Sequence, residues 1–412
     1  MKRILMIAYH FPPLAGSSGI QRTLRFVRYL PEFGWQPIVL SANPRAYERT
    51  SEDLMGEIPE GTVVSRAFAL DAARHFSIAG RYAAATARPD RWISWKFAGI
   101  REGMRLIGKY APDAIWSTYP IATAHVIASE LRRRSELPWV ADFRDPMAQD
   151  GYPADPVTWR RFLEIEAEAV GKAALSLFTT PGAARIYRGR YPDRAAHMRV
   201  LENGYDEESF QGLPLPPSPA EPLNPGSLTL LHSGIVYPSE RDPAPLFIAL
   251  EAMKRDGSLA PGSLKIRFRA PVHDDLLRAL AGKHGVASFV ETCPAVPYRD
   301  ALAEMSRAEG LLVMQAANCN EQIPAKVYEY LRTGRPVLGL TDPAGDTAGA
   351  LREAGIRSIA ALDSPEGIAR LIERFMSGER EDFSPDPARV ESASRRERTR
   401  VFATLLDEMT SG

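Results

Sequence analysis

Hydrophobic and polar positions along this chain alternate between two kinds of segment. Short apolar runs, which predict buried strands, are followed by longer segments whose apolar residues recur with helical spacing. In the first half the runs span 3–9, 36–42, 113–118 and 138–143, and GIQRTLRFVRYLPEF, with helical spacing, follows the first run. Strands that alternate with helices predict a parallel sheet covered by helices on both faces.

The second half repeats this pattern. Its apolar runs and helical segments follow one another at 228–234, 245–255, 264–270, from Asp274 onward, 310–316 and 336–341. Residues 211–226, QGLPLPPSPAEPLNPG, are rich in proline and predict a stiff connector. The last segment, 389–409, is charged and helical in period, and it could pack on either half.

The length of the chain fits two domains. It has 412 residues, of which 45% are hydrophobic, and single cores stop growing at roughly 250 to 300 residues. We expect an N-terminal Rossmann-like domain at 1–210, a linker at 211–226, a second Rossmann-like domain at 227–385, and a C-terminal helix within 386–412 that could pack back on the first domain. Open α/β sheets place ligands at the carboxyl ends of their strands, so we expect a cleft between the domains to be the site.

Composition narrows the possible partners. Lys plus Arg and Asp plus Glu number 51 each, so no global field favours nucleic acid, and we expect no nucleic-acid partner. Two cysteines, Cys293 and Cys319, exclude a disulfide framework and a four-cysteine zinc site, and suit a reducing compartment. The start, MKRILMIAYHFPPLAGSSG, lacks a cleavage site and predicts a strand, and no run reaches the roughly 18 apolar residues of a spanning helix. We expect a cytoplasmic protein.

A glycine-rich loop follows the first predicted strand. It contains Gly16, Ser17, Ser18 and Gly19, and an amphipathic helix comes next. Glycines there let backbone N–H groups approach an anion at a helix N-terminus. The loop is not G-x-G-x-x-G and no acidic residue ends the second strand, so a nicotinamide oxidoreductase fits least. An ordinary strand-to-helix turn remains an alternative.

The second half contains a comparable strand end. Gly234 ends the run at 228–234, and Arg241 stands seven residues later in the loop before a helix. An arginine at this distance can reach a diphosphate held over the edge of the sheet. A surface ion pair with Glu240 or Asp242 is the alternative.

The segment NEQIPAKVYEYLRTGRPVL predicts a helix with Pro324 at its first position and Gly334 at its C-terminal cap. Lys326 and Glu329 are three residues apart and share a face of that helix. The two oxygens of a carboxylate match the two vicinal hydroxyls of a ribose, and an ammonium nearer the helix N-terminus matches phosphate. An exposed ion pair between the two residues is the alternative.

Several motifs resemble those of one enzyme family. Glu321 and Glu329 form E-x7-E, and with the following Y-L-x-x-G-x-P-V-L they resemble the C-terminal signature of retaining GT-B glycosyltransferases, family 4 in particular. LENGYDEESF at 201–210 resembles the family's N-G-x-D-x-x-x-F, and VPYRDAL at 296–302 resembles its segment around the base. The resemblance implies an α/β protein of the GT-B fold, with two Rossmann-like domains whose parallel sheets face each other across an inter-domain cleft.

This resemblance also implies an activity. A retaining glycosyltransferase would move a sugar from a nucleoside-diphosphate sugar to a glycan or a polyprenyl-diphosphate-linked acceptor, in bacterial surface polysaccharide or exopolysaccharide synthesis. By this resemblance Glu329 would hold the ribose, Glu321 the donor sugar, and Arg241 with Lys326 the leaving diphosphate. Further donor contacts would come from Gly16, Ser17, Ser18, Gly19, Gly234, Val296, Tyr298, Ile323 and Pro324. There is no D-x-D motif, so we expect no metal and no cofactor, with basic side chains serving in place of a metal.

The chain departs from the family pattern at two places. Ile235 stands where the family usually has a second basic residue, which leaves Arg241 more of the charge. DFRDP, at 142–146, stands where many members have a His-Asp pair. Asp145 could be catalytic, and Asp142 or Arg144 could contact the acceptor. A buried salt bridge that pins the loop is an equal alternative.

Residues 91–109, RWISWKFAGIREGMRLIGK, predict a basic amphipathic helix. Phe97, Ile100, Met104 and Ile107 form its apolar side. That side could pack into the core, or it could lie on an anionic membrane and make the protein peripheral on the inner face of the cell membrane. Two other functions also remain open: a nucleoside-diphosphate-sugar epimerase on the same fold, and a non-catalytic partner subunit.

Overall fold

The computed structural model describes residues 1–17, 19–77, 79, 81–215 and 221–411, and it divides into two compact units. Unit 1 comprises Met1–Asn203 and Arg395–Gly412, and unit 2 comprises Gly204–Ser394. The chain thus leaves unit 1 ahead of the proline-rich stretch and returns to it for the last helix. Of that stretch, 216–220 lies outside the described residues.

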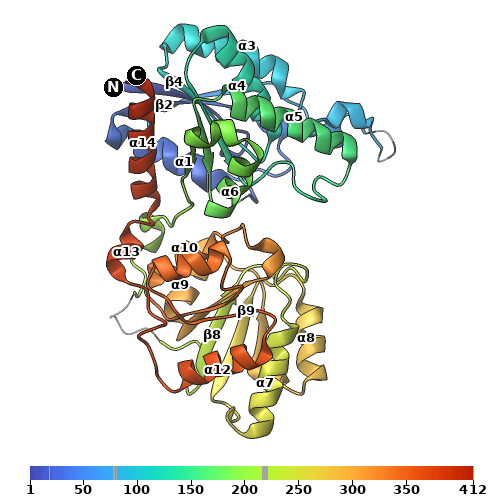
Figure 1. Ribbon diagram of the computed structural model, residues 1–412, viewed down its shortest axis with the longest axis vertical. Coiled ribbons are helices and arrows are strands. Elements are labelled where there is room, and N and C mark those ends of the chain that lie inside the picture. Colours follow the sequence, from blue (N-terminus) through green and yellow to red (C-terminus); the bar gives the residue numbers. More distant parts are fainter. Residues whose placement is uncertain (18, 78, 80, 216–220, 412) are drawn as a thin grey trace. The chain divides into compact units, whose positions relative to one another are not determined.

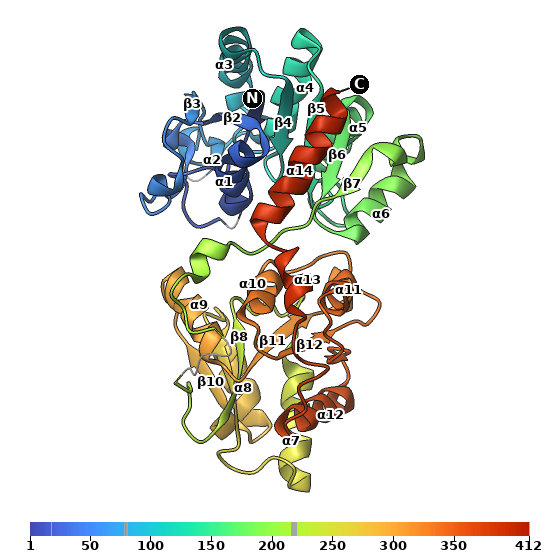
Figure 2. The same cartoon turned by 90° about the vertical axis from the view of Figure 1, so that its left-hand side faces the viewer.

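Unit 1, which contains both ends of the chain marked in Figure 1, is built on a parallel sheet with the strand order β3-β2-β1-β4-β5-β6-β7, most of which is labelled in Figure 2. Its strands are β1 Lys2–Ile7, β2 Trp35–Ala42, β3 Val63–Ala67, β4 Ala114–Thr118, β5 Trp139–Arg144, β6 Leu175–Phe178 and β7 Met198–Val200. From β1 the successive strands β2 and β3 are added on one side, and β4 to β7 on the other, so the strand order changes direction between β1 and β4. Loops that leave these two strands diverge at the carboxyl edge, which is where open α/β sheets bind ligands.

Helices cover both faces of this sheet. They are α1 Gly19–Tyr29, α2 Ala72–His75, α3 Trp95–Tyr110, α4 Ala122–Ser135, α5 Pro156–Lys172, α6 Pro181–Arg190 and α14 Arg395–Thr410. Side chains of β1 alternate between the faces: Leu5 and Ile7 join the core beneath α3 to α6, whereas Ile4 and Met6 join the core beneath α1 and α14. Figure 2 shows α14 running alongside the other elements of this unit.

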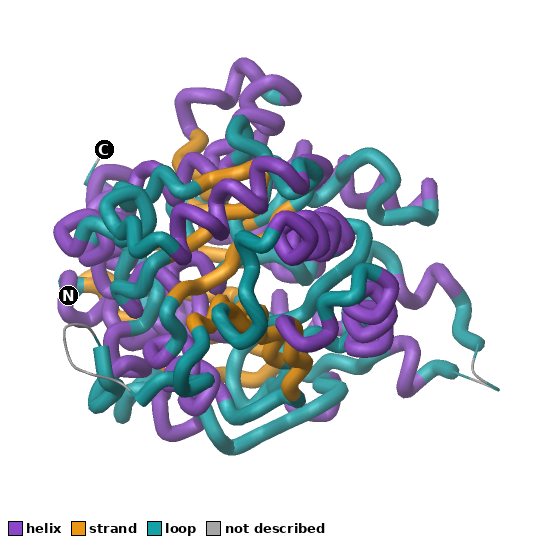
Figure 3. The backbone as a smooth tube through the Cα atoms, turned by 90° about the horizontal axis from the view of Figure 1, so that it is seen from below, coloured by secondary structure: helices purple, strands orange, loops and turns teal. Residues whose placement is uncertain are grey.

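Unit 2 repeats the arrangement with the strand order β10-β9-β8-β11-β12-β13. The strands are β8 Leu228–Ser233, β9 Leu264–Arg269, β10 Val290–Cys293, β11 Gly310–Gln315, β12 Val337–Thr341 and β13 Ile359–Ala360. The helices are α7 Ala244–Asp256, α8 Asp274–Lys283, α9 Tyr298–Arg307, α10 Lys326–Thr333, α11 Asp346–Glu353, α12 Pro365–Met376 and α13 Pro387–Glu391. Helices α7, α8 and α12 pack on one face, and α9, α10 and α11 on the other. Figure 3 shows strands in orange with helices in purple around them. Here the order changes direction between β8 and β11.

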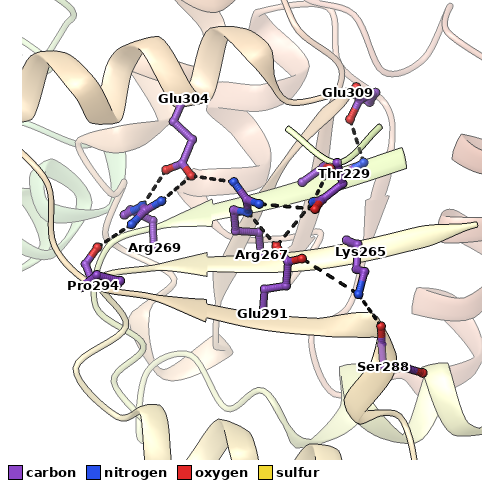
Figure 4. A network of polar contacts seen from close by, with 10 residues as sticks. Thr229, Lys265, Arg267, Arg269, Ser288, Glu291, Pro294, Glu304 and Glu309 are labelled. Carbon is purple, nitrogen blue, oxygen red and sulfur yellow. Dashed lines mark hydrogen bonds and ion pairs between the residues drawn. The ribbon is translucent and has the colours of Figure 1, made fainter. Parts of the chain in front are cut away.

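A ladder of charged residues lies between β9 and α9 (Figure 4). Arg267 and Arg269 project from β9 on the face opposite to its buried apolar residues. Arg269 pairs with Glu304 of α9 at 2.6 Å, and Arg267 reaches Glu304 at 3.1 Å and Glu291 of β10 at 2.8 Å. Alternation along β9 therefore reflects an apolar core on one side and an ion-pair network on the other.

The expected elements are present, with differences at their ends. The segment expected as one helix at 389–409 is two helices, α13 and α14, separated at Ser392–Ser394. This expectation was wrong because the chain passes there from unit 2 to unit 1. The strands β3, β6, β7, β10 and β13, of two to five residues each, were not predicted.

The basic amphipathic helix at 91–109 corresponds largely to α3, and its apolar side is core. Ile100 is buried, and Met104 and Ile107 pack partly against the same core. Phe97 is the exception, with 75% of its surface exposed. The geometry thus favours the core alternative over a membrane-facing stripe. Within the part of the chain that the structure describes, no helix is long and apolar enough to span a membrane.

Candidate functional site

The candidate residues of unit 2 meet where the strand order changes direction. Gly234 directly follows β8 with a φ of 112°, a backbone conformation that glycine adopts far more readily than other residues. A Cβ at this position would lie 3.0 Å from Nζ of Lys326, the first residue of α10. Gly234 therefore allows the lysine side chain to lie directly against the end of β8.

The ammonium of Lys326 has a buried partner. Its Nζ lies 3.1 Å from Nε2 of His232, a β8 residue that has no exposed surface. Burial, with a further contribution from nearby Arg241, lowers the pKa of Lys326 to about 7, although Glu329 acts in the opposite direction. Burial and the neighbouring Lys326 also hold the pKa of His232 well below its usual value, so its ring is neutral near pH 7.

Arg241 lies in the loop between β8 and α7 with its side chain 11% exposed. Its guanidinium carbon stands 5.2 Å from the centre of the Tyr237 ring, and its nearest carboxylate contact is a loose 3.7 Å from Glu240. Buried Nε of Arg241 donates no hydrogen bond to any residue that the structure describes. The surface ion pair considered from the sequence is thus weakly formed, and a desolvated donor remains available for an anion.

Glu329 lies on α10 within one turn of Lys326. Its Oε1 accepts a hydrogen bond of 2.7 Å from the hydroxyl of Tyr298, the first residue of α9. Tyr298 is 49% exposed and Val296, in the loop before α9, is 37% exposed. The structure therefore brings together the residues expected from the sequence to hold a ribose and a base.

The charged ladder of Figure 4 fixes the loop that carries Val296. Arg269 donates a hydrogen bond of 2.7 Å to the carbonyl oxygen of Pro294, while its guanidinium is held by Glu304. Glu304 comes from α9, the helix that Tyr298 begins. The loop and the helix start are thus tied to the same guanidinium.

The loop after β11 carries the remaining donor-site candidates, which are Glu321, Ile323 and Pro324. Glu321 is exposed. Ile323 is only 8% exposed and packs in the core with Val327, so its side chain cannot line a ligand site and only its backbone could. The sequence predicted Pro324 as the first residue of the helix, and this was wrong: α10 begins at Lys326. Pro324 belongs to the turn before the helix, in which its carbonyl oxygen accepts a hydrogen bond from Val327 N.

A neighbouring cavity of about 370 Å³ does not suit a diphosphate. It opens beside the ends of β11, β12 and β13 and is lined by Asp242, Pro245, Ala316, Ala317, Asp342, Ala361, Leu362 and Asp363. Three of these residues are aspartates and none is basic, so the cavity repels anions.

In unit 1 the glycine-rich loop meets two basic side chains. Ser17 Oγ accepts a hydrogen bond of 3.2 Å from Gly19 N and lies 3.2 Å from Nδ1 of His10. A Cβ at Gly19 would fall 2.8 Å from Nη1 of Arg144 and still closer to the His10 ring. Burial and Arg144 lower the pKa of His10 to about 4. Gly16 has a φ of 78°, and Ser18 lies outside the described residues.

A pocket of about 280 Å³ adjoins this loop. Its lining combines aromatic rings, two arginines and a carboxylate: Tyr9, His10, Leu14, Ala15, Gly16, Ser17, Glu48, Arg49, Arg91 and Trp92. Arg91 is paired with Glu48 at 2.7 Å and stands over the Trp92 ring at 4.8 Å. Aromatic faces beside charged groups suit a sugar or a phosphorylated sugar.

In the DFRDP segment, Asp142 forms a buried salt bridge with Arg22. Asp142 is fully buried, and both of its oxygens accept hydrogen bonds of 2.9 Å from the Arg22 guanidinium; Thr118 adds another at 3.0 Å. This geometry favours the pinning salt bridge over an acceptor contact for Asp142. Arg144 has a φ of 62° and turns the chain, and Asp145 beside it is exposed at the surface.

Two histidines were missed from the sequence. His232 stands two residues before Gly234 in LLHSG, and His10 follows the first apolar run. The signal for both was their position at the end of a predicted strand, at the edge where ligands bind. Neither belongs to a spacing motif, so this position was the only sequence signal, and their partners are seen only in the structure.

Replacing Gly234 by alanine tests the close approach of Lys326. The φ of 112° disfavours alanine, and the new Cβ would displace the ammonium at 3.0 Å. We expect a loss of about 1 kcal/mol of stability and a loss of affinity for a nucleoside diphosphate of about tenfold. Gly257→Ala, at the end of α7 with a φ of 84° and open space around it, is the control: it also places alanine at a positive φ, and it should leave the affinity unchanged. Equal affinities of the two variants would contradict the role of Gly234.

Comparison with solved structures identifies the fold. A structure of Anabaena HepE in complex with UDP matches with a TM-score of 0.62 at 12% identity, over 100% of this chain and 98% of that one. A glycosyltransferase from Rickettsia africae ESF-5 matches with a TM-score of 0.65 at 11% identity, covering 99% and 98%. A UDP-N-acetylglucosamine 2-epimerase matches with a TM-score of 0.54 at 14% identity, covering 99% and 96%.

The sequence gives no comparable match. No protein-family model and no curated protein matches the chain. The structural matches nevertheless cover both units, and the chain has a GT-B-like fold with parallel sheets of 7 and 6 strands. The fold class expected from the sequence is confirmed.

Proposed function

We propose that the chain is a glycosyltransferase that takes a sugar from a nucleoside-diphosphate sugar and binds its diphosphate at Lys326 and Arg241. The observation that carries this proposal is that two desolvated cations, Lys326 and Arg241, lie beyond the end of β8. The buried Nε–H of Arg241 has no hydrogen-bond partner among the described residues. Glu329, hydrogen-bonded to Tyr298, stands one turn farther along α10. Similar structures support the ligand class, since HepE is described in complex with UDP and with UDP-glucose.

These residues would divide the work of the reaction. Lys326 and Arg241 would stabilise the charge that develops on the leaving diphosphate, which is the largest contribution a protein makes to such a transfer. Glu329 would bind the ribose hydroxyls and Glu321 the donor sugar, and Val296 with Tyr298 would flank the base. Retention of configuration, as in the resembling family, would follow from acceptor attack on the face that the diphosphate leaves.

We also propose that unit 1 binds the acceptor. The pocket beside the glycine-rich loop offers Tyr9 and Trp92 rings to a sugar and Arg49 to a phosphate group. A glycan or a lipid-diphosphate-linked sugar has this chemistry. Asp145, exposed in the loop after β5, remains our candidate for a catalytic contact with the acceptor.

An epimerase is the second candidate because one similar structure is a UDP-N-acetylglucosamine 2-epimerase. Epimerisation needs a group that removes a proton from the sugar. His232 does not fit that role, because it is fully buried and both ring nitrogens already have partners. His232 therefore cannot supply the base of an epimerase.

One experiment separates the functions. The protein is incubated with UDP-, GDP-, ADP-, CDP- and dTDP-sugars, with and without acceptor sugars, and the products are followed by NMR. We expect release of a nucleoside diphosphate and a product of unchanged anomeric configuration. A new nucleotide sugar formed without release of a diphosphate would show an epimerase, and no turnover of any donor would contradict both functions.

The pKa of Lys326 predicts a pH dependence of donor binding. Its free-state value of about 7 means that the ammonium is mostly formed at pH 6 and mostly lost at pH 8. An anionic diphosphate needs the charged form, so affinity for UDP-glucose should be highest below pH 7 and fall by up to about tenfold per pH unit above it. Titration calorimetry from pH 6 to 9 measures this fall, together with proton uptake on binding. A flat profile would show that Lys326 does not carry the interaction.

A further inference from the structure

We propose that His232 is a positioning residue for the donor diphosphate: its ring accepts a hydrogen bond from Lys326 and so aims the remaining N–H groups of the ammonium at the ligand. The inference rests on the proposed function of Lys326. It assigns a role to a buried residue that touches no ligand itself.

Hydrogen bonding at the first ring nitrogen fixes the direction of this contact. His232 Nδ1 lies 2.9 Å from the carbonyl oxygen of Leu312 on β11, and a carbonyl can only accept. Nδ1 must therefore carry the proton, and in a neutral ring Nε2 is then an acceptor. Lys326 donates to it across 3.1 Å. The backbone of Ile235 also forms a hydrogen bond with this ring, so the tautomer set by Leu312 is the premise that a nitrogen NMR experiment must test.

The ammonium keeps enough donors for a phosphate. It has three N–H groups, of which His232 takes one. Gly234 contributes no side chain on the flank of Nζ, since even a Cβ would come within 3.0 Å. The two remaining N–H groups are thus directed by one fixed bond near the end of β8.

His232 also opposes a competing contact. The charged groups that act on Lys326 are Arg241, which repels its ammonium, and Glu329, which attracts it. Without the acceptor on β8, the flexible side chain would turn toward Glu329 on its own helix and occupy the carboxylate proposed for the ribose. His232 therefore keeps the cation and the carboxylate available for different parts of the donor.

Helix α10 does not depend on His232 for its place. Tyr330 of α10 accepts a hydrogen bond of 2.8 Å from Ser233 N of β8, and Val327 and Leu331 pack in the core below. A change at His232 should therefore move the lysine side chain and leave the helix in position. This separation makes the inference testable by substitution.

Two variants of the full chain test the role. In His232→Asn the amide nitrogen replaces Nδ1 and keeps the bond to Leu312, but nothing replaces Nε2; in His232→Gln the longer side chain can return an acceptor near Nε2. We expect His232→Asn to weaken binding of the nucleoside diphosphate about tenfold and to move the fall in affinity to higher pH, because Lys326 then pairs with Glu329. His232→Gln should recover most of the affinity.

The outcomes are distinct. Wild-type affinity and an unchanged pH profile in folded His232→Asn would overturn the inference, and so would equal losses in both variants without a shift of the profile. If no diphosphate among UDP, GDP, ADP, CDP and dTDP binds the wild type, this result contradicts the proposed function itself, and the inference about His232 falls with it.

A measurement on the wild type covers the case in which His232→Asn does not fold. Nitrogen NMR of the histidine rings should show His232 with protonated Nδ1 and bare Nε2 between pH 6 and 8. A protonated Nε2 would overturn the inference.

Discussion

Replacing Lys326 by alanine should abolish most of the affinity for a nucleoside-diphosphate sugar, by about a hundredfold or more. The ammonium is buried at the strand end, and truncation of a desolvated charge partner costs about 2 to 5 kcal/mol. Calorimetric titration with the best-binding donor measures the loss. Lys254→Ala is the matched control, because this lysine lies at the end of α7 and donates to the carbonyl oxygen of Gly285 instead.

Replacing Lys326 by methionine, which removes the charge and keeps the length of the side chain, should not destabilise the free protein. The folded pKa of Lys326, about 7, lies below its ordinary value of 10.5, so folding favours the neutral amine. For a base whose pKa is depressed, the penalty is complete below pH 7 and disappears as the pH rises toward 10.5. Lys326→Met should therefore raise Tm, and more so at pH 6 than at pH 9. A lower Tm at pH 6 with lost affinity would indicate damage to the fold in place of a lost ligand contact.

The second large effect concerns stability of unit 1. Asp142→Ala should cost about 3 to 5 kcal/mol, because it leaves the Arg22 guanidinium, which is 3% exposed, buried without its carboxylate. For a unit of this size the loss corresponds to a fall in Tm of about 10 °C, measured by calorimetry. The exposed Arg133–Glu130 pair on α4 provides the control, and Glu130→Ala should change stability by less than about 1 kcal/mol.

A double substitution tests whether the unpaired Arg22 charge causes this loss of stability. Arg22→Met combined with Asp142→Leu removes both charges and should recover much of the stability lost in Asp142→Ala, since the buried unpaired charge is then gone. An Asp142→Ala protein with an unchanged Tm would contradict the pinning role and reopen the acceptor contact as its alternative.

The proposed diphosphate site could be predicted in outline because topology brings strand ends together. Gly234 and Lys326 are far apart in the sequence, yet Gly234 directly follows β8, and Lys326 begins the helix that comes after the adjacent parallel strand β11. Loops at the same edge of a sheet must converge, so strand positions were enough to bring these candidates together. The choice of nucleotide sugar as ligand came from the resemblance to a family and not from the strand pattern.

Contacts between side chains could not be predicted in this way. His232 meets Lys326 only because a left-handed glycine leaves room, and nothing in the spacing of LLHSG shows a partner 94 residues later. Asp142 is tied to Arg22, 120 residues earlier, by a bond that depends on how α1 lies on the sheet. Ile323, in contrast, sits next to the site in sequence but faces the core, because the turn before α10 rotates it inward.

Titration of the full-length protein with a nucleoside diphosphate and its monophosphate tests the central claim most directly. Lys326 and Arg241 predict that the diphosphate binds at least about tenfold more tightly than the monophosphate, and that Arg241→Ala removes this difference. Equal affinities for both nucleotides, or a difference that survives Arg241→Ala, would contradict a diphosphate site at the end of β8.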